Sequence, residues 1–154
     1  MVAADIVQLT LGGFCESAGL RQRGSAWSRR REDLIHVVEL QKSGQGRRYR
    51  VEIGIWLLTL GETTSPRTAS CHVRTGLEAQ MPEESRTHLQ QLLDLEVSIA
   101  KRERRDELTT LLDDHLAPVL GSITSAAELR TPHGARFLRA AHVGPQARAI
   151  VGRR

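Results

Sequence analysis

Hydrophobic and polar residues alternate with a period of two in two neighbouring stretches of the chain, residues 34–41 and 49–58. Successive side chains of a β-strand point to opposite faces, so each stretch predicts a strand with two distinct faces. The first stretch is apolar on both faces near its middle, which indicates a central strand. Its faces carry Leu34, His36, Val38 and Leu40 on one side and Ile35, Val37, Glu39 and Gln41 on the other.

The segment SGQGRR, residues 43–48, joins these two strands and supplies two glycines, which suits a hairpin loop. The apolar face of the second strand must point to the core, with Tyr49, Val51, Ile53, Ile55 and Leu57 opposite Arg50, Glu52, Gly54, Trp56 and Leu58. After a breaker at residues 61–66, SCHVRTGL predicts a third strand. In that strand we expect Cys71, Val73 and Thr75 inward and His72 and Arg74 outward.

Helical periodicity replaces the alternation after MPEE, where Pro82 and two glutamates form a typical helix start. The strongest apolar stripe is Leu108, Leu111, Leu112, Leu116 and Val119. Pro118 lies inside this stripe and should kink or end the helix. SAAEL, residues 125–129, predicts a serine-capped turn, and ARFLRAAHV, residues 135–143, a final basic helix.

The order of these elements predicts a single α+β domain over residues 1–154. We expect an N-terminal helix at 4–20 and a three- to four-stranded antiparallel meander at about 27–77. A helical part at about 82–145 should pack on one face of the sheet, followed by a frayed tail.

Composition supports an ordinary globular domain, since 154 residues with 40% hydrophobic and 26% charged residues can bury a real core. No apolar run is long enough to span a membrane, and MVAADIVQLTLGG lacks the basic region of a signal peptide. We therefore expect a cytoplasmic bacterial protein. Cys15 and Cys71 match no metal spacing, and in a reducing compartment we expect two buried free thiols without a disulfide.

The net charge of +4 changes the picture little. Basic and acidic residues number 11 and 8 in residues 1–80, and 11 and 10 in the remainder, with the two signs interleaved. The chain has only five aromatic residues (Phe, Trp and Tyr), which leaves little material for stacking on bases. Nucleic-acid binding is therefore a weak alternative.

The polar face of the predicted sheet is the best candidate binding surface, because adjacent strands lie about 4.8 Å apart and their side chains can converge. It would carry Glu39, Gln41, Glu52, Trp56, His72 and Arg74. The alternative is a solvent-exposed face with cross-strand ion pairs. A candidate basic patch, across the first hairpin, consists of Arg29, Arg31, Arg47, Arg48 and Arg50, with a solvated sheet edge as its alternative.

Sequence patterns for catalysis or metal binding are absent. Gln41-Lys42-Ser43 precedes its glycines and leads into a strand, so it does not form a phosphate loop. Cys71 and His72 are neighbours and would point to opposite faces of a strand. Asp113, Asp114 and His115 would splay across a helix, and no HxxH or HExxH spacing occurs. We expect no catalytic residues, no metal site and no cofactor.

Residues 19–58 combine several features in a fixed order. A Gly with basic residues and a second Gly leads to an aromatic-x-Arg strand start, a strand ending in Leu-Gln-Lys-Ser, and an aromatic-led strand centred on Ile-Gly-Ile. The positions concerned are Gly19, Gly24, Trp27, Arg29, Leu40, Gln41, Lys42, Ser43, Tyr49, Gly54 and Ile55. This stretch resembles the core of a bacterial family of domains of unknown function, DUF4304.

The resemblance extends over roughly residues 10–130, through CHVRTGL and LDDHLAPVLGSITSAAELR. It departs from the family in MPEESRTHLQQLLDLE, which lacks a tryptophan at the start of the first long helix. The resemblance implies an α+β fold and carries no settled activity. Immunity or toxin-neutralising roles are suspected for some small bacterial domains of this kind, which is an analogy and no site argument.

From these observations we favour a non-catalytic domain that acts by binding, with a protein partner and possible immunity-type function. The alternatives are a small-ligand binder or enzyme that uses Glu52, Trp56, His72 and Arg74, and a weak nucleic-acid binder. The sequence does not predict the oligomeric state.

Overall fold

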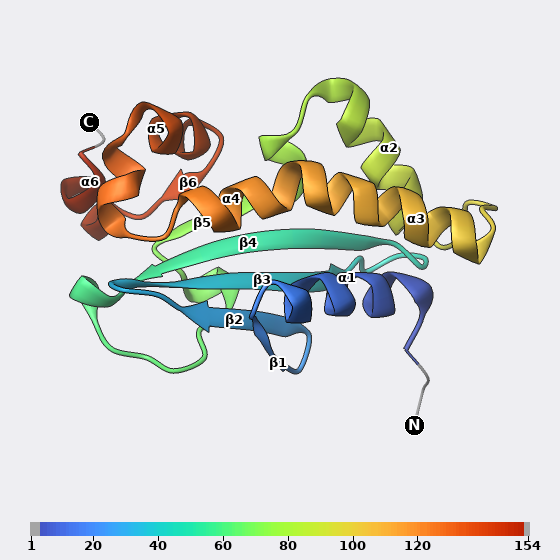
Figure 1. Ribbon diagram of the computed structural model, residues 1–154, viewed down its shortest axis with the longest axis horizontal. Helices are drawn as coiled ribbons and strands as arrows, with labels where there is room; N and C mark the ends of the chain where they lie inside the picture. Colours follow the sequence, from blue (N-terminus) through green and yellow to red (C-terminus); the bar gives the residue numbers. More distant parts are fainter. Residues whose placement is uncertain (1–3, 153–154) are drawn as a thin grey trace.

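The computed structural model describes residues 4–152 of the chain. They form an α+β fold in which helices cover one face of a six-stranded antiparallel sheet (Figure 1). The strands are arranged in sequence order, which confirms the predicted meander. Their bounds are β1 Arg21–Arg23, β2 Ala26–Arg30, β3 Leu34–Lys42, β4 Tyr49–Leu57, β5 Val73–Gly76 and β6 His142–Val143.

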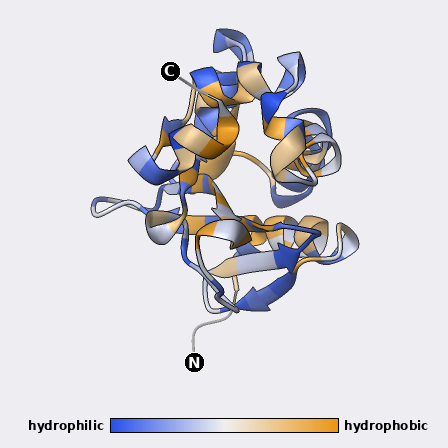
Figure 2. Cartoon of the chain, turned by 90° about the vertical axis from the view of Figure 1, so that its left-hand side faces the viewer, coloured by the Kyte–Doolittle hydropathy of each residue, from blue (hydrophilic) through white to orange (hydrophobic). Residues whose placement is uncertain are grey.

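The α-helices pack on the inner face of the sheet, and short helical turns connect the elements. The α-helices are α1 Ile6–Ser17, α2 Glu83–Leu93, α3 Lys101–Leu111, α4 Ala117–Ser122, α5 Pro132–Arg139 and α6 Pro145–Val151. Short 3-10 turns are η1 Leu58–Leu60, η2 Thr68–Ser70, η3 Leu77–Gln80 and η5 Ala126–Arg130, and η4 Leu112–Leu116 is a π-helical turn. The helices carry both apolar and hydrophilic residues, as amphipathic helices that pack on a core do (Figure 2).

The main core lies between the sheet and the helices. β3 is buried along almost its whole length, which confirms that it is a central strand. The face of β4 predicted to point inward does so, with Val51, Ile53, Ile55 and Leu57 all buried. The predicted leucine stripe of the long helix meets it and is buried as well.

The sheet has six strands, so the prediction of three to four was wrong. β1 and β2 form a short hairpin whose turn contains Gly24 at φ 63°, a conformation that glycine adopts without steric cost. All three residues of β1 are exposed, so no hydrophobic alternation marks this strand. β6 lies in the stretch predicted as the end of the last helix, and it pairs with the edge of β5 through Val143 opposite Val73.

The C-terminal segment contains a further helix, which reaches into the tail that was predicted to fray. Residues 145–151 form α6, and Ala147 and Val151 bury their side chains in the main core. Burial of these two apolar side chains offsets the entropy of ordering a short helix. Residues 153 and 154 of the predicted frayed tail lie outside the described residues.

Pro118 does not end the long helix. The turn before it widens into the π-helical η4, and α4 then continues with Pro118 in its first turn (Figure 1). Proline has no N–H for the i−4 carbonyl and its ring crowds that carbonyl, and a π turn is a recognised way to absorb such a defect. The serine-capped turn was predicted correctly, since the Ser125 hydroxyl accepts from the Glu128 N–H in η5.

Residues 58–72, which we call the strap, cross the outer face of the sheet, opposite the helices (Figure 1). A small second core of Ala26, Ile35, Val37 and Cys71 lies there. Cys71 was predicted to point to the inner face with Val73, which was wrong because it precedes β5 and belongs to the strap. Gly54 makes this close approach possible, since a Cβ there would lie 2.6 Å from the Cys71 Sγ.

Candidate functional site

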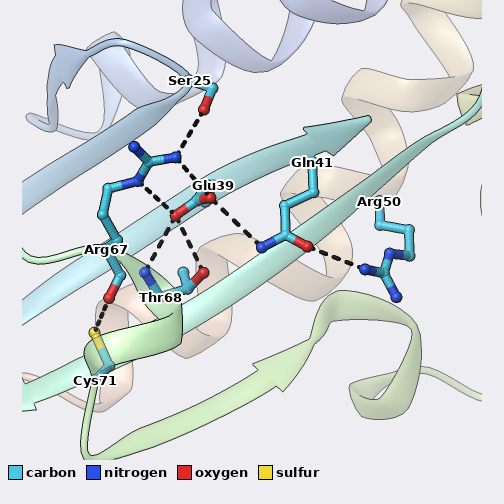
Figure 3. Close-up of polar contacts among 7 residues, drawn as sticks. All are labelled: Ser25, Glu39, Gln41, Arg50, Arg67, Thr68 and Cys71. Carbon is cyan, nitrogen blue, oxygen red and sulfur yellow. Dashed lines mark hydrogen bonds and ion pairs between the residues drawn. The ribbon is translucent and has the colours of Figure 1, made fainter. Parts of the chain in front are cut away.

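Glu39 of β3 is the centre of a polar cluster on the outer face of the sheet (Figure 3). It is only 5% exposed, yet it keeps a full set of hydrogen-bond donors. Arg67 of the strap forms a bidentate pair with it, at 3.0 Å from Nε to Oε1 and 2.9 Å from Nη2 to Oε2. The Thr68 N–H and hydroxyl also donate to Oε1, at 3.2 and 3.1 Å.

These contacts set the protonation of the Glu39 carboxyl. The hydrogen bonds from Arg67, with those from Thr68, hold its pKa below the ordinary value, against the opposing effect of burial. Glu39 is therefore ionised at neutral pH, and protein donors occupy its oxygens. Its role is to fasten the strap to the central strand, and a general base would need a free lone pair.

Two more side chains extend the cluster across the sheet. The Gln41 amide donates to Glu39 over a long 3.5 Å, and its oxygen accepts from Arg50 at 3.1 Å (Figure 3). Arg67 also donates to the Ser25 hydroxyl at 3.2 Å. The cluster thus ties together β3, β4, the strap and the turn between β1 and β2.

The predicted binding face is divided by the strap. Gln41, Glu52 and Arg74 line one small hollow beside Thr68. Glu52 stands directly opposite Glu39 in the register of β3 and β4, and burial raises the pKa of its carboxyl, with Arg50 opposing this shift.

Trp56 and His72 lie apart from that hollow, and their contacts attach the strap to β4. Their rings are 4.4 Å apart, and the Trp56 indole donates to the Gly61 carbonyl at 2.8 Å. The Leu57 N–H donates to His72 Nδ1 at 2.9 Å, so this nitrogen carries no proton. Burial lowers the pKa of His72, which keeps the ring neutral and able to accept.

The predicted basic patch is not continuous. Arg29 and Arg31 lie near the Leu34 end of β3, whereas Arg47, Arg48 and Arg50 lie at its far end. Arg29 pairs with His36 and Arg50 with Gln41, so even the nearest members of the two groups are five residues, or about 17 Å, apart along β3. The first hairpin was expected to bring the two groups together, but these arginines flank opposite ends of the same strand.

A groove of about 1250 Å³ does unite members of both predicted sets. Glu39, Gln41 and Arg47 line it together with Arg67, Lys42 and the exposed side of α1. Sequence analysis did not identify α1 as a wall, and the feature that marks it is visible only in the structure. Leu9 is 60% exposed and is the one large hydrophobic residue left exposed in the described part of the chain.

The start of α1 is fixed to this groove by two contacts. The Asp5 carboxylate caps the helix by accepting from the Gln8 N–H at 2.9 Å, and the Gln8 side chain returns a capping-box bond. The Tyr49 hydroxyl donates to the other Asp5 oxygen at 2.5 Å. Burial and this Asp5 carboxylate raise the pKa of Tyr49 to about 12, so the hydroxyl stays protonated.

The described residues give little support for nucleophilic catalysis or metal binding. No group of three or more His, Cys, Asp or Glu side chains is placed to hold a metal ion there. Burial raises the pKa of both Cys15 and Cys71 to about 12, which keeps the thiols protonated and unreactive. The helices described are all too short or too polar to cross a lipid bilayer.

Comparison with known proteins gives one match. The model of a family described as "Domain of unknown function (DUF4304)" matches residues 14–122, from within α1 to the end of α4. No curated protein and no solved structure matches. The matched residues include most of the groove and the whole Glu39 cluster, whereas α5, β6 and α6 lie beyond them.

Proposed function

The chain belongs to the DUF4304 family, and from this premise we propose that it is a non-catalytic protein-interaction domain that binds an extended segment of a partner in the groove beside α1. A cytoplasmic location is part of the proposal, and an immunity-type partner would be one instance of it. The support comes from an open strand edge, from the chemistry of the groove walls and from the hydrogen bonds that already occupy Glu39, Asp5 and Tyr49.

The open edge of β3 is the observation that carries the proposal. β2 begins at Ala26, which pairs with Glu39, and the preceding Ser25 carbonyl accepts from the Leu40 N–H. Backbone groups alternate along a strand, so the N–H and C=O of Lys42 point to the same side, where β2 no longer runs. Within the described residues nothing bonds them, and Lys42 lines the groove. An added strand could bond there.

The groove walls suit a peptide of mixed character. Leu9, Gly12 and Gly13 give the groove an apolar side on α1, and Lys42 and Arg47 add positive charge. Of the three lining carboxylates, Asp5 and Glu39 accept from protein donors, which leaves Glu16. Trp27 also lines the groove, and its buried Nε1 has no acceptor among the described residues. An extended segment with an apolar and an acidic side chain would match these walls.

Selection of peptides from a random display library against the full chain tests the proposal. We expect selected peptides to bind the protein, and Lys42→Ala, which removes only the side-chain charge, to weaken binding less than Lys42→Pro. Lys42→Pro removes the edge N–H while leaving the bonds to β4, and we expect it to weaken binding about ten-fold. Leu9→Asp should weaken binding as well. Failure to select peptides, or binding that Lys42→Pro leaves unchanged, would refute the proposal.

The alternative functions have less support. A small-ligand binder or enzyme would need Glu52 and Arg74 together with Trp56 and His72. Trp56 instead donates to the Gly61 carbonyl and His72 accepts from the Leu57 N–H, and neither lines the hollow of Glu52 and Arg74. A nucleic-acid binder would need a continuous basic patch, and β3 separates its two halves.

A further inference from the structure

A second hollow, of about 620 Å³, is lined by residues of the β1–β2 hairpin and of the strap. Four arginines line it, Arg21, Arg23, Arg29 and Arg30, and the other lining residues are glycine, glutamine, serine and threonine. Acidic side chains do not contribute to the lining. We call it the arginine hollow.

The charges of the arginine hollow are poorly compensated. Arg30 pairs with Glu62 at 3.0 Å, but both side chains are largely exposed, so this pair holds little energy. Arg23 donates only to the Ser65 hydroxyl, at 3.0 Å. No salt bridge involves Arg21 in the described chain. At least three of the four guanidinium groups therefore lack a carboxylate.

Arg29 also lines the hollow, and its guanidinium is held by main-chain and ring atoms of the protein. Its Nη atoms donate to the Ala18 carbonyl at 2.5 Å and to the Leu120 carbonyl at 3.2 Å, and Nη2 also contacts His36. All these partners are neutral, and its Nε is buried without any partner among the described residues. Burial, followed by the nearby charge of Arg31, lowers the pKa of Arg29, so its charge is held at a cost.

The main chain adds a donor to the same place. β1 begins opposite Ser28, so β2 continues unpaired on that side beyond it. By the alternation of strand bonds, the N–H of Arg30 points to this open edge, and no described residue accepts from it. Guanidinium groups, Ser and Thr hydroxyls and a free backbone N–H are the donors that bind tetrahedral oxyanions.

We propose that the arginine hollow binds the phosphoryl group of a small phosphate-bearing molecule. Its volume of about 620 Å³ lies in the range of small-molecule sites, so it has room for a molecule that carries a phosphoryl group. The backbone of a nucleic acid would need a longer run of basic side chains, because phosphates recur along it. Gln22 is the one lining residue that this site shares with the groove beside α1, and either proposal can fail without the other.

Calorimetric titration of the full chain with inorganic phosphate, pyrophosphate and ATP tests this proposal. We expect one molecule to bind per chain. Arg21→Gln and Arg23→Gln should each weaken binding at least five-fold, because each removes a charged donor. Both side chains are exposed, so neither substitution should disturb the core. Arg102→Gln, on the exposed side of α3, is the matched control and should bind as the unaltered protein does. Circular dichroism checks that each variant is folded.

The relative affinities identify the source of the phosphoryl group. Equal binding of phosphate and ATP would assign recognition to the phosphoryl group alone, and tighter binding of ATP would add contacts to the rest of the molecule. A single-stranded oligonucleotide is the third arm. Absence of phosphate, pyrophosphate and ATP binding, or binding that Arg102→Gln weakens as much as Arg21→Gln does, would overturn the proposal. Binding of the oligonucleotide alone would do so as well.

Discussion

Two glutamates that face each other across β3 and β4 show how far the surroundings of a residue decide its behaviour. Glu39 and Glu52 are direct neighbours in the register, and both lie on the outer face. Arg67 and Thr68 stabilise the charged form of Glu39 and lower its pKa, whereas burial raises the pKa of Glu52. The same side chain therefore stabilises the fold as an anion at one position and weakens it at the other.

Replacing each glutamate with glutamine should change stability in opposite directions. Glu39→Gln removes a charged acceptor from Arg67 and should lower the free energy of unfolding by about 1–3 kcal/mol at pH 7. Glu52→Gln removes the cost of burying a charge and should raise it. Urea unfolding between pH 3 and pH 8 measures both.

The pH dependence of the two effects follows from the sign of each shift. The lowered pKa of Glu39 contributes stability at pH values above the pKa of the unfolded chain, near 4.5. This stability is lost as the pH falls through the pKa of the folded protein, so the cost of Glu39→Gln should shrink in acid. A raised pKa does the reverse, so the gain from Glu52→Gln should also vanish in acid, as Glu52 takes up its proton. Equal effects of the two substitutions at pH 7 would contradict this account.

At the scale of elements, Arg104 joins α2 to α3 without an ion pair. It is 3% exposed, and its guanidinium donates to the carbonyls of Gln91, Leu92 and Asp94 at the end of α2 and of Val97 in the following loop. The last carbonyls of a helix have no partner within it and carry partial negative charge. Arg104 therefore caps α2 from the neighbouring helix.

Arg104→Met keeps most of the side-chain volume and removes every donor. We expect the free energy of unfolding to fall by about 2–4 kcal/mol, because buried carbonyls lose their partners. Arg102→Met, two residues earlier on the exposed side of α3, should change it by less than about 0.5 kcal/mol. Chemical denaturation gives both values, and similar losses for the two variants would show that the cap is unimportant.

Some elements could be predicted from sequence because their burial repeats with a simple period. β4 buries every second residue from Val51 to Leu57, β3 buries its first seven residues in a row as a central strand does, and the leucines of α3 and η4 recur every three or four. β1 and β6 give no such signal, since one is exposed and the other is two residues long. β6 is a strand only because β5 presents an edge to it, which is information from the tertiary structure.

The candidate site shows the same limit. The alternation of β3 identified Glu39 and Gln41 as neighbours on one face. It could not identify Arg67, which lies 28 residues further on in a loop without periodicity and reaches Glu39 only because the strap folds back over the sheet. Asp5 and Tyr49 likewise meet across 44 residues. Long-range contacts of this kind leave no local pattern.

At the scale of the whole molecule, one polar chain connects the sheet with helices at both ends of the family region. His36 of β3 is fully buried, and Arg29 contacts both its ring and the end of α1. His36 Nε2 lies 2.5 Å from the carbonyl of Ile123, which follows α4. A carbonyl can only accept, so Nε2 carries the proton, and the neutral ring can accept from Arg29 at Nδ1.

Protonation of His36 should therefore loosen the whole fold in mild acid. Burial lowers the pKa of His36 from 6.5 to about 4. The hydrogen bond to Ile123 opposes this shift, and the positive charges of Arg29 and Arg31 add to it. The unfolded chain takes up the proton first, so stability is complete above about pH 6.5 and declines as the pH falls toward 4. The expected loss is about 3 kcal/mol.

His36→Gln keeps a donor and an acceptor at this position but cannot titrate. Its free energy of unfolding should be lower than that of the unaltered protein at pH 7 and should depend less on pH between 6.5 and 4.5, a window above the ordinary range of the carboxylates. His72, whose pKa is also lowered, contributes in the same direction, so His72→Gln serves as the comparison. An unchanged pH dependence in His36→Gln would mean that this buried histidine does not couple the sheet to the helices.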